Sequence, residues 1–502
     1  MKPVTGDHLK LVFGLKLKQV RQDRGLSLKQ VAGKTGLSVS YLSEIESGKK
    51  YPKPEKLIGL ANALQVPFDD LVSMKMGKTL NPLMELLDSS LVREFPFHMF
   101  GINIRSLVDL ATVSPEKTGA LVRTLTEFIR TYDLKLEDFL FAALRSYQKV
   151  NGNYFEELEQ EAADFGKEHG IVRASLQEKC EIFQKAVESA NTVIDSENLT
   201  NYPDLMDLRS VYVNSKPARL LLNPELRVSQ KAFILGREIG YQRLELKQRP
   251  KTSSLMKATR FDRVLDNYKA SYFSGAMIIP ERVLVADLKT WFNHKKWNQK
   301  HLRGLLSCYG VTPEMFLYRL SQVLPRHFGL KDIYYLRFNH SKDGKYYRLI
   351  KELNMSQLAM PSGINLYEHY CRRWLSIRQL EEAVSGKGAS DEPVIEAQRS
   401  HFIDQDLTIL NISILRPLYL KPDSFSSMTL GIVLTEKVSQ TIHFAFDSSI
   451  PDVDVNETCE RCFMSKDACG QRVAPPFVFN ESERLKTREN SLKCLLRDFG
   501  EV

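Results

Sequence analysis

The chain has 502 residues, of which 43% are apolar and 26% are charged, a composition that excludes a fully disordered polymer. Its 70 Lys and Arg against 61 Asp and Glu give a net charge of +9, and residues 1–75, with 13 basic and 7 acidic side chains, hold +6 of it. No apolar run of about 18 residues predicts a membrane span, and the first ten residues lack an export signal. We therefore expect a cytoplasmic, multidomain protein whose N-terminal part attracts a polyanion.

Residues 9–72 form a series of short predicted helices separated by turn signals. Ser27 and Ser38 stand where N-caps are needed, ahead of predicted helices at residues 28–34 and 39–46. Gly36 lies between these helices, where a tight turn needs a positive φ. Two short helices around a glycine turn are typical of a helix-turn-helix. Its shared core is predicted to contain Val31, Ala32, Leu37, Leu42 and Ile45.

This segment closely resembles the lambda-repressor-like, or xenobiotic-response-element, helix-turn-helix family. The similarity includes Val31-Ala32, Gly36-Leu37-Ser38, Tyr41-Leu42, Ile45-Glu46, Gly48-Lys49 and Leu60-Ala61. In that family the second helix enters the major groove of operator DNA, and the protein binds two half-sites as a dimer. A helical packing module is the alternative.

The resemblance implies base contacts at the start of the second helix and phosphate contacts from nearby lysines. Val39, Ser40 and Ser43 are the expected base readers, and the lysines are expected to hold phosphates. The full candidate set for double-stranded DNA is Lys29, Ser38, Val39, Ser40, Tyr41, Ser43, Lys49 and Lys50.

Residues 80–168 are predicted to be helical throughout. Ser114-Pro115 marks a helix start, and later apolar stripes include Phe155, Leu158 and Phe165. Such stripes usually form a core, and the functional interpretation is a connector that helps the DNA-binding module to dimerise. We predict domain boundaries at residues 1–75, 76–170, 171–290 and 291–502.

Residues 209–222 predict two short strands around an Asn-Ser-Lys-Pro turn, followed by a helix from Ser229 and a second helix that ends before Pro280. This order resembles the ImmA/IrrE-type metallopeptidase domain. In that family the first helix carries HExxH, whose two histidines bind one zinc while the glutamate activates water.

The catalytic pattern of that family is incomplete here. Arg237 and Tyr241 stand at the two histidine positions, and only Glu238 is retained. No acid is present at residues 267–269, where the third ligand is expected, and arginine stays protonated and cannot ligate zinc. We therefore predict a degenerate peptidase scaffold with no catalytic residue, and we expect Glu238 to be a buried helix acid with a local partner. The rival hypothesis is a zinc peptidase that cleaves a repressor.

Extended apolar runs in residues 325–355 and 405–447 predict an antiparallel or mixed sheet with helices, a sensor-like unit. Asp343-Gly344 is the predicted turn of a hairpin. The predicted fold is therefore multidomain, with an all-α helix-turn-helix module, an α-helical connector, and an α/β (α+β) region that is metallopeptidase-like and then sensor-like.

Cys459, Cys462 and Cys469 stand as C-x2-C-x6-C near the end of the chain. A C-x2-C turn places two thiolates on one metal ion or cluster, and a third cysteine can return to the same site. Cys371 is the predicted fourth ligand, whereas Cys180 is predicted to pack within a helix. Zinc, an iron–sulfur cluster and free thiols all remain open on spacing alone.

The whole arrangement resembles the short-chain fatty acyl transcriptional regulator family of bacteria. The terminal motif of that family matches Cys459, Cys462, Cys469, Gln471, Arg472, Ala474, Pro475 and Pro476. Its upstream Cys-Pro-x-Trp is similar to Cys371-Arg372-Arg373-Trp374, with arginine in place of proline. The resemblance implies a dimeric regulator that responds to an acyl-CoA effector and holds a [4Fe–4S] cluster; structural zinc would suit the same thiolates. A third hypothesis is an antitoxin- or phage-type repressor that binds a protein partner.

Overall fold

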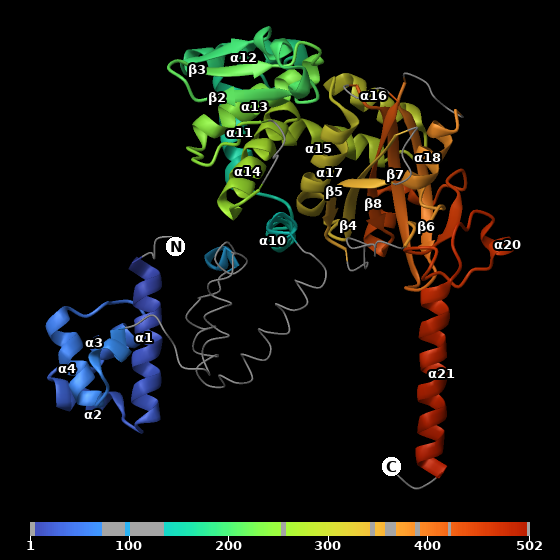
Figure 1. The fold of residues 1–502 in the computed structure, drawn as a ribbon. Coiled ribbons are helices and arrows are strands. Elements are labelled where there is room, and N and C mark those ends of the chain that lie inside the picture. The colour runs from blue at the N-terminus through green and yellow to red at the C-terminus, as the bar shows by residue number, and fades with distance from the viewer. Residues whose placement is uncertain are drawn as a thin grey trace. The chain divides into compact units, whose positions relative to one another are not determined.

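The computed structural model describes residues 6–72, 96–100, 135–252, 258–341, 347–356, 368–386, 392–419 and 423–498. The chain divides into two compact units, Met1–Ala143 with Ala258–Phe261, and Leu144–Lys257 with Asp262–Val502 (Figure 1). A helical N-terminal module, further helices and a mixed sheet follow in the predicted order. The predicted division into four domains is finer and stays a prediction. No helix among the described residues is long and apolar enough to span a membrane.

The N-terminal domain is built from five helices: α1 Gly6–Asp23, α2 Leu28–Thr35, α3 Val39–Glu46, α4 Pro54–Leu64 and α5 Phe68–Val72. Ser27 caps α2 and is part of a capping box with Gln30, and the Oγ of Ser38 accepts a hydrogen bond from the Tyr41 amide at 3.1 Å. Gly36 adopts a φ of 69° between the two helices. The predicted caps and turn are confirmed.

The core of this domain joins α1 to the other helices. Val31, Leu42 and Ile45 are buried as predicted, and Ala32 and Leu37 pack against them while partly exposed. The other members are Phe13, Leu17, Leu57, Leu60, Ala61, Leu64 and Leu71.

Helix α1 passes very close to the end of α3. A Cβ added to Gly14 would lie 2.3 Å from the Ile45 carbonyl oxygen, so this position needs glycine. Arg21 donates to both carboxylate oxygens of Glu46, at 2.6 and 2.9 Å, and fixes the same contact.

The helices that follow are α10 Leu136–Val150, α11 Glu156–Glu168 and α12 Leu176–Ser189. The predicted stripe in α11 is buried at Leu158, Ala162 and Phe165, and Cys180 is buried in α12. The predicted helix start at Ser114-Pro115 lies outside the described residues.

A three-stranded sheet has the order β1-β3-β2, with β1 Thr192–Asp195, β2 Ser210–Val213 and β3 Ala218–Leu222. The antiparallel pair β2–β3 is the predicted hairpin, whereas β1, which runs parallel to β3, was not predicted. Helices α13 Val228–Arg243 and α14 Phe261–Ile278 follow, as the sequence indicates.

The six-stranded sheet has the order β5-β4-β8-β7-β6-β9 and is mixed, as predicted, because β9 alone of its described strands pairs in parallel. Its strands are β4 Ile333–Ser341, β5 Arg348–Asn354, β6 Val394–Phe402, β7 Leu407–Pro417, β8 Ser424–Val433 and β9 Asp452–Val455. Strands β4 and β5 form the expected hairpin, whose turn at Asp343-Gly344 lies outside the described residues. Strands β6 and β9 were not predicted.

Helices cover the two faces of this sheet (Figure 1). Helix α18, Leu375–Val384, packs on the face that holds Leu336 and Phe338. Helix α17, Pro313–His327, packs on the other face, where Tyr318 contacts Tyr335 with ring centroids 5.3 Å apart. The remaining helices are α15 Glu281–Phe292, α16 Gln299–Tyr309, α19 Glu436–Thr441, α20 Lys466–Cys469 and α21 Phe477–Asp498.

The predicted extended run at residues 441–446 is wrong. Residues His443–Phe446 form a 3-10 turn after α19. The Phe444 ring packs between Trp291 and Trp297, with centroids 5.4 and 5.5 Å away. Aromatic packing therefore overrides the local alternation of apolar residues.

Candidate nucleic-acid interface and other candidate sites

The start of α3 presents the three predicted base readers together. Val39, Ser40 and Ser43 are all exposed, and Val39 keeps 44% of its surface in solvent. Residues at i, i+1 and i+4 lie on one side of a helix. The structure therefore places the predicted readers on an exposed strip of small side chains at the N-terminal end of α3, and their contacts with bases stay a prediction.

Two other predicted residues have roles within the domain. The hydroxyl of Ser38 serves as the cap of α3. The Tyr41 ring lies between two lysines, with Lys56 Nζ 4.3 Å and Lys50 Nζ 5.6 Å from its centroid. Sequence reasoning missed Lys56, because it belongs to α4 and reaches this surface only through the fold.

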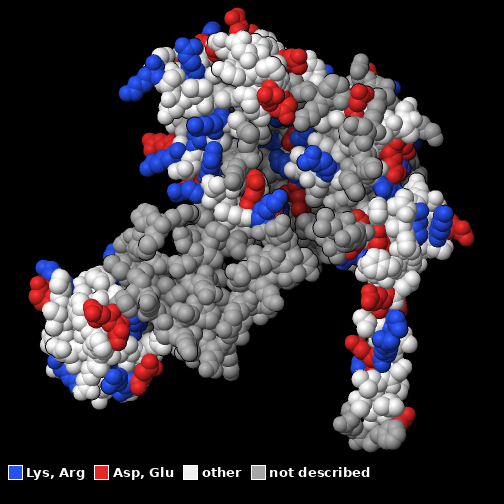
Figure 2. Space-filling model, in the orientation of Figure 1, with Lys and Arg blue, Asp and Glu red and all other residues white. Residues whose placement is uncertain are grey.

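The lysines near α3 differ in their partners. Lys50 forms an ion pair with Glu44 at 2.7 Å, and this contact raises the Lys50 pKa. Lys29 and Lys49 are exposed, and no carboxylate pairs with either of them within the described residues. Figure 2 shows basic and acidic side chains interspersed on the visible face of this domain, so charge alone does not mark the DNA-contacting surface.

The two positions that correspond to histidine ligands in the resembled peptidase lie beside the start of residues 267–269, where its third ligand is expected. Arg237 and Tyr241 of α13 face Asn267 of α14, with the Arg237 Nη2 2.5 Å from the Asn267 Oδ1 and the Tyr241 hydroxyl 3.4 Å from the same oxygen. Arg237 and Tyr241 are buried. An arginine therefore stands at the position where the resembled peptidase has a zinc ligand, and a guanidinium is not a zinc-ligating group.

Glu238 has the local partner that was expected of it. It is buried and forms an ion pair with Arg249. The Arg249 guanidinium lies 3.3 Å from the centroid of the Tyr212 ring. Burial lowers the Arg249 pKa to about 10, with Arg237 adding to that effect and Tyr212 opposing it. The one retained residue of the catalytic pattern is therefore held in a structural contact.

The chain segments that hold the predicted cysteine ligands run side by side. The Cys371 amide donates to the Glu457 carbonyl at 3.2 Å, and the Cys459 amide donates to the His369 carbonyl at 3.0 Å. Arg472 then closes the terminal loop by donating to the carbonyls of Cys459 and Cys462, at 2.7 and 2.5 Å. The backbone thus brings Cys371 beside cysteines almost 90 residues later in the sequence.

The thiols of these cysteines lie in a protected region. Cys371, Cys459 and Cys462 are each 5% exposed, and Cys469 is half-buried. Burial raises the Cys371 pKa to about 11, and the neighbouring Cys459 and Cys462 add to the effect. Burial also raises the Cys462 pKa, with Arg472 opposing it and Cys469 contributing. Among the described residues, no three side chains of ligand type stand together closely enough to hold a metal ion.

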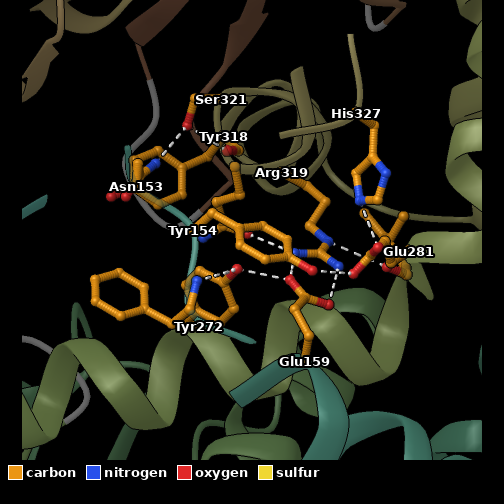
Figure 3. Close-up of polar contacts among 12 residues, drawn as sticks. Asn153, Tyr154, Glu159, Tyr272, Glu281, Tyr318, Arg319, Ser321 and His327 are labelled. Carbon is orange, nitrogen blue, oxygen red and sulfur yellow. Dashed lines mark hydrogen bonds and ion pairs between the residues drawn. The ribbon is translucent and has the colours of Figure 1, made fainter. Parts of the chain in front are cut away.

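A buried polar network joins α17 to α11 and α14 (Figure 3). Arg319 donates to both carboxylate oxygens of Glu159, at 2.5 and 2.7 Å, and the Tyr272 hydroxyl donates to Glu159 at 2.6 Å. Arg319 is 1% exposed and also donates to Gln322 and to the Ile279 carbonyl. Its donors meet acceptors on three sides, so this network fixes the position of α17.

The comparisons with known proteins give one family match, which lies in the N-terminal domain. Residues 17–71 match the model of a helix-turn-helix family. No curated protein matches the chain significantly. The structure of a Mycobacterium tuberculosis transcriptional regulator is similar at a TM-score of 0.45 and 18% identity, over 66% of this chain and 93% of that one. A TM-score below 0.5 does not establish a shared fold, whereas the family match identifies the N-terminal domain as a helix-turn-helix.

Proposed function

We propose that the chain is a DNA-binding transcriptional regulator whose helix-turn-helix domain binds an operator while the larger unit senses a small molecule. The observation that carries the proposal is the helix-turn-helix match at residues 17–71, together with the exposed strip at the start of α3. In such domains the N-terminal residues of the second helix face the edges of the bases. The net charge of +6 in residues 1–75 supplies attraction to phosphates.

Each DNA contact has a distinct expected role. Ser40 and Ser43 hydrogen-bond to bases, and Val39 contacts a thymine methyl group. Lys29 and Lys49 bind phosphates directly, whereas Lys50 first exchanges Glu44 for a phosphate. Two copies of the chain would bind the halves of an inverted repeat, one helical turn apart.

Genome-wide binding of the full chain tests this assignment. The variant Ser40→Ala/Ser43→Ala/Lys49→Ala should lose the discrete peaks of the wild type, because base and phosphate contacts vanish together. Lys300→Ala, an exposed lysine of α16, is the control and should keep them. Retention of the same peaks at equal affinity by the triple variant would show that α3 is not the reading helix.

We propose further that the chain is not a peptidase. The Arg237–Asn267 contact supports this, because a protonated guanidinium stands at the ligand position. Arg237→His/Tyr241→His is expected to remain inactive, since Asn267 is not an acid. Cleavage of a protein by the purified wild type, abolished in Glu238→Gln, would overturn the proposal.

The cysteines are proposed to hold one metal centre that joins the terminal loop to the sheet. Cys371, Cys459, Cys462 and Cys469 would be the ligands, and a bound [4Fe–4S] cluster would supply oxidant sensitivity whereas zinc would supply only stability. Their burial and their neighbouring backbones support the proposal. Anaerobic purification followed by iron, sulfide and zinc analysis tests it. Cys459→Ser should lose metal and thermal stability, and Cys180→Ser should lose neither; a metal-free wild type that melts like Cys459→Ser would contradict it.

The proposed effector is an acyl-CoA. The full chain should bind propionyl-CoA or acetyl-CoA, and this binding should change its affinity for operator DNA. A protein partner captured in place of a metabolite would favour the antitoxin-type alternative. Titration of both CoA esters in the presence and absence of operator DNA separates the two functions.

A further inference from the structure

The face of the large sheet beneath α17 carries a row of basic side chains. Arg337 of β4 stands opposite Lys351 of β5 in the antiparallel ladder. On β7, Arg416 stands opposite Ser426 of β8, and the Ser426 hydroxyl accepts a hydrogen bond from the Arg337 Nε at 3.0 Å. Residues that oppose each other on neighbouring strands share a face. Lys351 and Arg337 therefore form one pair across the sheet, and Arg416 lies on the same face level with Asn339, two residues further along β4. We call these three side chains the basic row.

Helix α17 lies over the basic row and contributes one carboxylate to it. Glu314, in the first turn of the helix, forms an ion pair with Arg337 at 2.5 Å. Four residues along the same helix, the Tyr318 ring lies 3.4 Å from the Lys351 Nζ. The N-terminus of α17 adds the positive end of its dipole at this place. The Glu159–Arg319 network holds the helix there.

Positive charge exceeds negative charge in this group. The three cations of the row act on one carboxylate, Glu314, and Arg209 adds its positive field to theirs. Burial would raise the Glu314 pKa, but these cations hold it at about 2. Burial and the neighbouring arginines lower the pKa of Lys351 to about 8, although Glu314 opposes them. Like charges in a poorly solvated site are unfavourable unless an anion joins them.

Polar atoms around the row also have unused hydrogen-bonding capacity. In the part of the chain that the structure describes, no hydrogen-bond partner reaches the Arg416 Nε, the Tyr335 hydroxyl or the Asn339 Oδ1. Tyr335 and Asn339 belong to β4 and alternate with Arg337 on the same face. The Arg416 Nε and the Tyr335 hydroxyl are donors, whereas the Asn339 Oδ1 is an acceptor. Buried donors in a native structure normally have partners, so these two donors beside excess positive charge suit an anionic ligand.

We propose that the basic row binds a phosphate-bearing small molecule. Arginine forks match phosphate oxygens in bidentate geometry, and a phosphate ester carries a charge of about −1.5 to −2 at neutral pH. The three cations of the row against Glu314 leave a charge of +2, to which Arg209 adds, and such a group offsets most of this positive charge. The row lies between a sheet and a covering helix, a setting that suits a small molecule and not the backbone of a DNA duplex. The inference deepens the proposed sensing function by giving the effector a phosphate and a place to bind.

Titration of the full chain with inorganic diphosphate tests the proposal. At a concentration about a hundredfold above its dissociation constant, the ligand should raise the melting temperature of the wild type by about 5 °C or more. Arg416→Met should bind diphosphate roughly 30-fold more weakly, because the lost charge pairs directly with the anion. Arg326→Met is the matched control, since Arg326 is an exposed arginine of the same α17 that lies outside the row, and it should bind like the wild type.

The stability of the free protein separates a binding site from a structural ion cluster. Without ligand, Arg416→Met should melt at the wild-type temperature or above it, because one like charge has been removed. A lower melting temperature in the free variant, equal diphosphate binding by wild type and Arg416→Met, or no binding by the wild type would each overturn the proposal. Displacement of diphosphate by a non-operator DNA duplex would also overturn it. No step of this test requires operator binding, so it fails or succeeds independently of the proposed function.

Discussion

Two groups of charged side chains on α17 have opposite compositions. At Arg319, one guanidinium meets one carboxylate, Glu159, in a bidentate pair, and neighbouring acceptors take its other donors. At Glu314, one carboxylate meets several cations, and the Arg416 Nε has no partner among the described residues. A buried charge cluster whose net charge is close to zero in the free protein contributes to the stability of the fold. A buried cluster with excess charge of one sign, which a bound ion of the opposite sign would neutralise, is typical of a binding site.

The largest expected effect lies in the balanced group. Arg319→Met leaves the Glu159 carboxylate buried without its counter-charge, so the free energy of unfolding should fall by about 3–5 kcal/mol. Urea unfolding of the full chain measures it. The double variant Glu159→Leu/Arg319→Met should recover most of the loss, because neither charge then remains buried. A loss of unfolding free energy below about 1 kcal/mol in the single variant would show that the Glu159–Arg319 pair does not hold α17 in place.

The same change in the unbalanced group should have the opposite consequence. Arg416→Met removes one of several like charges, so its unfolding free energy should be equal to that of the wild type or higher by up to about 1 kcal/mol. The same urea titration measures it. If Arg416→Met and Arg319→Met destabilise the chain equally, the distinction between the two groups is wrong.

Ligand affinity at the basic row should depend on pH. The Lys351 pKa is lowered from 10.5 to about 8, and the groups that act on Lys351 are Glu314, Tyr318, Tyr335, Arg337 and Arg209. An anion favours the charged lysine, so diphosphate affinity should fall as the pH rises through about 8.

The stability of the free protein should change with the opposite sign. Between pH 8 and 10.5 the unfolded chain binds a proton at Lys351 that the folded chain has lost, so stability relative to Lys351→Met should rise across this interval. Calorimetric titration and thermal melts across this range measure both effects. If diphosphate affinity depends on pH in Lys351→Met as it does in the wild type, the group that titrates is not Lys351.

The smallest expected effect contrasts two hydroxyls of the N-terminal domain. Ser38 caps α3, so Ser38→Ala should destabilise this domain by about 1 kcal/mol. Ser40 lies in the first turn of the same helix and is exposed, and the capping hydroxyl is that of Ser38, so Ser40→Ala should leave stability within about 0.5 kcal/mol while it weakens operator binding. Thermal melts and operator titrations of both variants measure the contrast. Equal destabilisation by Ser38→Ala and Ser40→Ala would contradict the separate roles assigned to the two hydroxyls.

The N-terminal domain was predictable because its signals are local. Ser27, Gly36 and Ser38 each act within four residues of their own position, through caps and a left-handed turn. The hairpin at residues 209–222 has the same local origin. The pairing of β9 with β6 depends on segments about 50 residues apart, and no local pattern of a four-residue strand indicates it.

The sites outside this domain depend on contacts that are distant in sequence. The sequence predicted that Arg237 does not ligate zinc. Its contact with Asn267 could not be predicted, because it depends on the packing of α13 against α14. The basic row draws on β4, β5 and β7 with α17 above them, and no spacing links them. One signal was available: Arg337 interrupts the apolar run of β4 at an inward position, where a charge needs a partner.

Selection of DNA from a random duplex pool by the full chain tests the central claim most directly. The account predicts enrichment of a two-fold motif whose half-sites are one helical turn apart, with binding that weakens steeply as salt increases. It also predicts that Ser40→Ala/Ser43→Ala/Lys49→Ala recovers no such motif. A wild-type pool without an enriched sequence, or the same motif selected by the triple variant, would contradict the assignment of α3 as a DNA-reading helix.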